Sequence, residues 1–233
     1  MIRILIAVAV LAIPFFVAVP SMGWSFGDIP RSANDESGLT FDRITDVGII
    51  QGFPDNTFRG NRAFTRYEAA AALSRMVDAL LIRRSGWDPL VAEVKDAVAT
   101  GSTMMSFTDV PRSHWAYDDV EKLENLGIVI GHPGARFDGN RSVTRIEFGV
   151  MVSRLAQQLN ITQPREHGLE LSIDLPSNHW AFHDLEWLLA EGYADGNHGT
   201  YFRGDRSFTR YEMAMVLSRM WDRFTELIEP ETF

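Results

Sequence analysis

A pattern of 21 residues occurs three times in this chain, and this internal repetition constrains the fold more than any other feature of the sequence. The copies align without a gap, and eight positions are identical in all three: the two glycines of G-x-x-x-G, then Phe, Gly, Arg, Thr, Arg and Glu. They occupy residues 48–68, 127–147 and 192–212. Because one short unit cannot bury its own apolar face, stacked copies are expected to share a core.

Each copy reads as a pair of helices joined by a turn-rich loop. In the second copy, apolar residues recur at helical spacing over residues 115–126, and Gly127 follows as a helix-ending glycine. After a loop rich in Gly and Pro, a second amphipathic helix begins at Thr144. The predicted fold class is all-α, with three tandem helix-pair repeats packed as a pseudo-three-fold bundle.

The N-terminal residues read as an export signal. Arg3 precedes an apolar run over residues 4–19, and small residues stand before Trp24 as at a cleavage site. The run is shorter than the roughly 20 residues of a membrane-spanning helix. The spacing between the first two copies exceeds that between the last two, which indicates an insert. The predicted organisation is a signal peptide at 1–23, repeats at 25–80, 104–160 and 170–225, and an insert at 81–103.

Composition excludes several classes of site. The chain has no Cys, which excludes disulfides, thiolate catalysis and Cys-ligated zinc. A formal net charge of −9 argues against bulk electrostatic binding of nucleic acid, although a local arginine pocket for an anion remains compatible with it. No nucleophile–base set, pair of acids or metal motif stands out, so we expect no enzyme activity, no cofactor and no metal site.

The recurring Thr-Arg-x-Glu tetrapeptide opens the second helix of each copy. Thr as N-cap with Glu three residues later is the capping-box pattern, in which each side chain accepts a hydrogen bond from a backbone N–H that the helix leaves unpaired. The predicted helix caps are Thr65 with Glu68, Thr144 with Glu147, and Thr209 with Glu212.

Capping does not explain the arginine of this motif, which occurs as Arg66, Arg145 and Arg210. A cation in the first turn faces the positive end of the helix dipole, which is mildly unfavourable. One interpretation is a site for a carboxylate or phosphate, and the other is an interhelical salt bridge. A further arginine stands three residues before each Thr and either completes the pocket or pairs with an acidic neighbour. These residues are Arg62, Arg141 and Arg206.

Tryptophans stand at matching positions near the start of the first helix in two copies, as Trp115 and Trp180. Each either anchors the core or offers a flat surface on which the apolar face of a sugar ring can stack. The preceding histidines, His114 and His179, lack a nucleophile or a second ligand at a fixed offset, and we interpret them as structural.

The repeats resemble S-layer homology domains, which carry F-x-D-V, HWA, G-x-x-x-G, F and T-R-A-E in this order. The resemblance covers residues 25 to about 225. In the second copy the matching residues are Phe107, Asp109, Val110, His114, Trp115, Ala116, Gly127, Gly131, Phe137, Thr144, Arg145 and Glu147.

The resemblance implies a three-fold pseudo-symmetric domain whose inter-repeat grooves bind a pyruvylated secondary cell-wall polymer. The carboxylate of the ketal-linked pyruvate would be held by Arg66, Arg145 and Arg210, with Trp115 and Trp180 as groove aromatics. The implied function is noncatalytic cell-wall anchoring of an exported chain, in the periplasm or at the cell surface, with the polymer on peptidoglycan as partner and an envelope protein as an optional second one. The alternative is a structural envelope scaffold, in which the arginines form salt bridges.

Two features depart from the family pattern. The third motif residue is Tyr67, Ile146 or Tyr211 instead of Ala, which is expected to reshape the pocket. The first copy has Asn34 where the others have Trp, so a groove that depends on an aromatic residue from this copy is expected to be weak.

Overall fold

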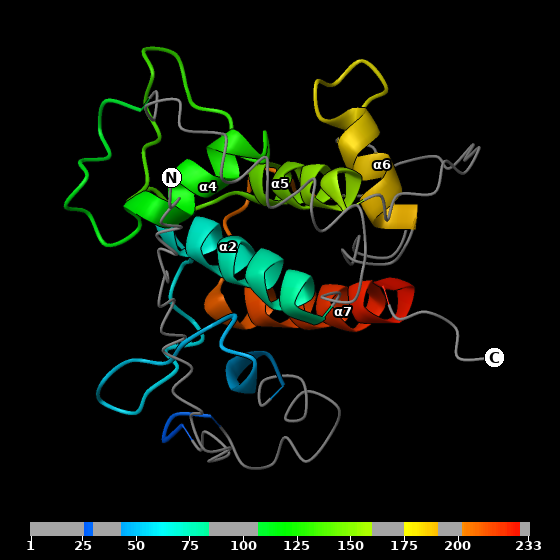
Figure 1. Ribbon diagram of the computed structural model, residues 1–233. Helices are drawn as coiled ribbons and strands as arrows, with labels where there is room; N and C mark the ends of the chain where they lie inside the picture. Colours follow the sequence, from blue (N-terminus) through cyan, green and yellow to red (C-terminus); the bar gives the residue numbers. More distant parts are fainter. Residues whose placement is uncertain (1–25, 30–42, 84–106, 160–174, 191–201, 229–233) are drawn as a thin grey trace, which may run out of the picture.

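The computed structural model describes residues 26–29, 43–83, 107–159, 175–190 and 202–228. The helices in this part are α2 (Arg66–Arg83), α4 (Tyr117–Asn125), α5 (Arg145–Gln158), α6 (Phe182–Ala190) and α7 (Arg210–Ile228) (Figure 1). Between the described helices, β structure is limited to isolated bridges. The all-α prediction is confirmed, whereas the predicted signal peptide and residues 84–103 of the predicted insert lie outside the described residues.

The three longest helices begin where the sequence predicts. α2, α5 and α7 each start at the residue after the motif threonine. In α5, the Thr144 hydroxyl accepts a hydrogen bond from the Glu147 amide (3.2 Å), and the Glu147 carboxylate accepts one from the Thr144 amide (3.1 Å). The equivalent bonds form at the starts of α2 and α7. Local sequence therefore sets all three helix starts.

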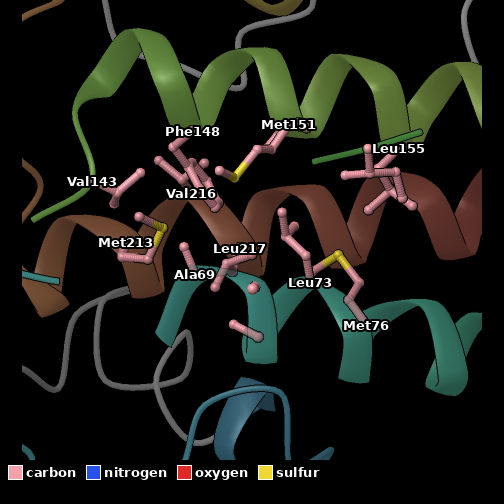
Figure 2. Close-up of a cluster of buried hydrophobic side chains, with 14 of the residues drawn as sticks. Ala69, Leu73, Met76, Val143, Phe148, Met151, Leu155, Met213, Val216 and Leu217 are labelled. Atoms are coloured by element: carbon pink, nitrogen blue, oxygen red, sulfur yellow. The ribbon is translucent and has the colours of Figure 1, made fainter. Parts of the chain in front are cut away.

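One core lies between α2, α5 and α7, as Figure 2 shows. The apolar positions of each helix recur every three or four residues, so they form one stripe, and the three stripes face one another. The central cluster includes Ala69, Leu73 and Met76 of α2, Phe148, Met151 and Leu155 of α5, and Met213, Val216 and Leu217 of α7.

The shorter helices cover the long helices of the preceding repeats. α4 of the second repeat packs on α2, and α6 of the third packs on α5. An ion pair between Lys122 of α4 and Asp78 of α2 (2.7 Å) crosses the first of these contacts. The helical turn at residues 43–46 meets α7 through an ion pair between Arg43 and Asp222. Each repeat thus depends on its neighbours for burial, while a three-fold relation of the complete repeats stays a prediction.

In the first and second repeats, an aspartate side chain holds the Phe-x-Gly segment through the backbone amides of that segment. The two carboxylate oxygens of Asp109 accept hydrogen bonds from the amides of Phe137 (2.7 Å) and Asp138 (2.8 Å). Asp28 binds the amides of the two equivalent residues in the first repeat in the same way. Asp138 has a φ of 54°, a left-handed conformation that is unfavourable for a residue other than glycine. The carboxylate therefore stabilises a strained turn.

These hydrogen bonds predict a pH dependence of stability. Desolvation raises the pKa of Asp109, but the two amide bonds and the charge of Arg136 outweigh it, so the pKa lies below its ordinary value of 3.8. The stabilisation is therefore present above about pH 4 and is lost as the pH falls through the lowered pKa.

We expect Asp109→Asn to reduce the free energy of unfolding at pH 7 by about 1–2 kcal/mol, because charged hydrogen bonds are lost. The difference from the unsubstituted chain should shrink at pH 3, when the native carboxyl is becoming protonated. Urea unfolding of both proteins at the two pH values measures it. An equal difference at both would show that the carboxylate charge is not involved.

Candidate functional site

The motif arginines join each long helix to the Phe-x-Gly loop of another repeat. In every case the guanidinium Nε donates to the carbonyl oxygen of the loop phenylalanine. The bonds run from Arg66 to Phe137 (2.9 Å), from Arg145 to Phe202 (3.0 Å) and from Arg210 to Phe58 (2.8 Å). The first repeat thereby contacts the second, the second contacts the third, and the third contacts the first.

Two of these arginines are buried and paired with glutamates. Arg66 and Arg210 are only 2% and 3% exposed. Nη1 of Arg66 lies 3.8 Å from Glu147, and Nη1 of Arg210 lies 3.1 Å from Glu68. Desolvation lowers the pKa of both guanidinium groups, and the glutamates act in the opposite direction. These are ion pairs of the kind that the salt-bridge interpretation expects.

The arginine three residues before each motif threonine pairs with the capping glutamate of its own repeat. Nη1 of Arg141 lies 3.2 Å from a carboxylate oxygen of Glu147, and Nη2 of the same arginine lies 2.9 Å from Nε2 of His132. Arg62 pairs with Glu68, and Arg206 pairs with Glu212. Each of these glutamates therefore serves both a helix cap and a cation.

The third motif residue packs on a glycine of another repeat. A Cβ atom built on Gly139 would lie 2.3 Å from the Tyr67 ring, and one on Gly204 would lie 2.3 Å from Ile146. Gly60 meets Tyr211 in the same way, at 2.1 Å. Tyr or Ile in place of the family's Ala therefore fills the contact between repeats, which explains why the loop requires glycine.

Both tryptophans are exposed, which makes the core-anchor interpretation wrong. Trp115 and Trp180 are 61% and 65% exposed. The histidines beside them have local partners, since Nδ1 of His114 accepts a hydrogen bond from the Ala116 amide (3.2 Å) and His179 makes the equivalent bond. The His114 ring also stacks on Tyr67, with centroids 4.0 Å apart. These contacts match the structural role predicted for the histidines.

A pocket of about 210 Å³ combines residues of all three repeats. Its walls are the loop at residues 49–53 and one face of α2, with Trp115 from the second repeat and Arg210 from the third. The structure thus brings two predicted binding residues together. The α2 face consists of Glu68, Ala71, Ala72 and Arg75, spaced as i, i+3, i+4 and i+7.

Sequence reasoning did not identify Arg75, Ala71 or Ala72 as pocket residues. The available signal was size: at the positions of the two alanines, the second copy has Val150 and Met151 and the third has Met215 and Val216. The first copy therefore has smaller side chains at these two positions than the other two copies. The tryptophan of this pocket comes from the next repeat, so the absence of Trp from the first copy does not deprive it of an aromatic residue. Asn34 itself lies outside the described residues.

The sequence model of the S-layer homology domain matches residues 25–70 and 106–148. The chain belongs to the S-layer homology family. The third predicted repeat lies outside the two matched regions, so a count of three domains stays a prediction. Within the described ranges, no helix of this S-layer homology chain is long and apolar enough to cross a membrane, and no cluster of metal-ligating side chains occurs.

Relatives of this S-layer homology chain include one anchoring protein and two outer membrane proteins by name. A cellulosome-anchoring protein of Acetivibrio thermocellus is 25% identical over 198 residues, 84% of this chain and 38% of that protein. Outer membrane protein SlpA of Thermus thermophilus is 37% identical over 102 residues, 44% of this chain and 11% of that protein. Outer membrane protein alpha of Thermotoga maritima is 53% identical over 49 residues, 21% of this chain and 12% of that protein. The chain spans a minor part of each.

Proposed function

We propose that this chain is a noncatalytic cell-wall anchor that binds an acidic, pyruvylated secondary polysaccharide attached to peptidoglycan. Its location at the cell surface follows from membership of the S-layer homology family and from the names of the relatives. The proposal includes three repeats around a pseudo-three-fold axis. The observation that carries it is the pocket on the first repeat, in which an exposed tryptophan stands beside arginines.

The pocket has the features of a site for one acidic sugar unit. Trp115 offers an exposed ring face, on which the C–H face of a pyranose can stack. The volume of about 210 Å³ lies below the roughly 300 Å³ at which sites for drug-sized ligands begin, and it suits a single sugar unit. Two arginines and one glutamate line it, which leaves one positive charge for an acid group.

The other two motif arginines, Arg66 and Arg145, support further anion sites. Nη2 of Arg66 is buried without a hydrogen-bond partner among the described residues. A buried donor of this kind favours an acceptor, such as a carboxylate oxygen of a ligand. We include Arg66 and Arg145, with Trp180 as the aromatic residue, in grooves equivalent to the pocket on the first repeat.

The alternative is an envelope scaffold that assembles through protein–protein contacts. The observation that favours it is the use of Arg66 and Arg210 in ion pairs between repeats. In this case the arginines would only hold the repeats together, and the wall polymer would not be needed.

Binding to purified peptidoglycan sacculi separates the two functions. We expect the chain to be retained on sacculi that carry their polysaccharide and to be released once the polysaccharide has been stripped. Trp115→Ala should lower the affinity about two- to tenfold, because one stacking contact is lost.

The matched control is Ile82→Ala, which removes an exposed apolar side chain at the end of α2, away from the pocket lining. This control should bind like the unsubstituted chain. Equal retention on stripped and unstripped sacculi would favour the scaffold instead.

A further inference from the structure

The pocket on the first repeat contains two guanidinium groups that differ in availability. Arg210 is almost fully covered, and each of its nitrogens already donates to a protein atom. Nε donates to the carbonyl oxygen of Phe58 (2.8 Å), Nη2 to that of Gln51 (2.8 Å), and Nη1 to the Glu68 carboxylate (3.1 Å). Two of these partners line the pocket, Gln51 in its loop wall and Glu68 on α2. Arg210 is therefore engaged in positioning that wall.

The Arg75 guanidinium, in contrast, is available to a ligand. It lines the same pocket, is half-buried, and makes no hydrogen bond or ion pair in the part of the chain that the structure describes. The one glutamate of the lining, Glu68, is already paired with both Arg62 and Arg210. The unbalanced positive charge of the pocket thus belongs to Arg75.

Two alanines of α2 form the floor of the pocket and give a ligand access to the Arg75 guanidinium. Ala71 and Ala72 lie on α2 between Glu68 and Arg75, and both line the pocket. Their small side chains leave room for a sugar unit between the α2 surface and Trp115. An arginine two turns beyond Glu68 can then present its planar fork to an acid group on that unit, because two parallel N–H···O bonds match a carboxylate.

We propose that Arg75 is the residue that pairs with the ligand carboxylate in this pocket, and that Arg210 is a positioning residue. Trp115 stacks on the sugar ring, and Ala71 and Ala72 form the floor beneath it. This inference rests on the proposed function and deepens it, since it assigns recognition of the acid group to a residue outside the Thr-Arg-x-Glu motif.

The test compares two forms of one probe by isothermal titration calorimetry on the full chain. The first form is the wall polysaccharide released from sacculi, and the second is the same polysaccharide after its carboxyl groups have been reduced to alcohols. Arg75→Gln should weaken binding of the acidic form about ten- to a hundredfold, as expected for the loss of a charged hydrogen bond. Binding of the reduced form should be unchanged by the substitution, and the melting temperature should be nearly unchanged because Arg75 has no described partner to lose.

The matched control is Arg223→Gln, which removes the same charge from a side chain on α7 that is 41% exposed and lies outside the pocket lining. It should bind both forms like the unsubstituted chain. If Arg75→Gln binds the acidic form normally while Trp115→Ala weakens binding, the assignment of Arg75 is overturned and the proposed function stands. The assignment also fails if Arg75→Gln weakens both forms equally. If the unsubstituted chain does not bind the acidic form, both the proposed function and the assignment of Arg75 are overturned.

Discussion

Replacement of Arg210 with methionine is expected to reduce the free energy of unfolding by about 3–5 kcal/mol, the range found when one member of a buried ion pair is removed. The guanidinium is 3% exposed and joins the third repeat to Glu68, Gln51 and Phe58 of the first. Without it, two carbonyl oxygens and part of a carboxylate lose their donor. Arg210→Lys should cost about 2 kcal/mol, because the charge remains but the fork is lost.

Urea unfolding with Arg223→Met as the control measures this effect. The Arg223 side chain is 41% exposed and pairs with Glu226 on the same helix, so its loss should cost less than about 1 kcal/mol. A double-mutant cycle that combines Arg210→Met with Glu68→Gln then measures the interaction between the two side chains. We expect a coupling free energy of about 0.5–3 kcal/mol. No difference between Arg210→Met and the control would mean that the contact between the repeats contributes nothing to stability.

Gly139→Ala is expected to reduce the free energy of unfolding by about 1–3 kcal/mol, the usual cost of overfilling a packed interior. The added methyl group would lie 2.3 Å from the Tyr67 ring. That ring cannot retreat easily, because it is stacked on His114 and lies 5.3 Å, centroid to centroid, from Phe137. The same contact recurs where Tyr211 meets Gly60, so Gly60→Ala should behave alike.

Gly27→Ala is the matched control, since the nearest atom to its added methyl group is 3.9 Å away. It should leave stability nearly unchanged. Combining Gly139→Ala with Tyr67→Ala, the residue of the family pattern, should cost less than the sum of the two single changes, because the smaller side chain removes the overlap. Additive costs in thermal or urea unfolding would show that the overlap with Tyr67 is not the cause.

The helices could be predicted from the sequence because their determinants are local. A threonine, a glutamate three residues later and apolar residues at a spacing of three or four are enough to set the starts of α2, α5 and α7 and the faces that they bury. Gly127 ends α4 with a φ of 67°, as its place after the apolar stripe predicts. The repeated motif likewise identified three arginines that make a common contact, from each Nε to the carbonyl oxygen of a loop phenylalanine.

Only the tertiary structure decided what those side chains contact. Local helix geometry alone predicts that a cation in the first turn is mildly unfavourable, because it faces the positive end of the helix dipole. The carbonyl oxygens that bind Arg66 and Arg210 lie 71 and 152 residues away along the chain. The exposure of Trp115, and its meeting with Arg210 and Arg75 in one pocket, also depend on three repeats coming together. A repeat pattern specifies which residue types recur within each copy, but contacts between copies depend on how the helices pack, and this packing is a property of the whole chain.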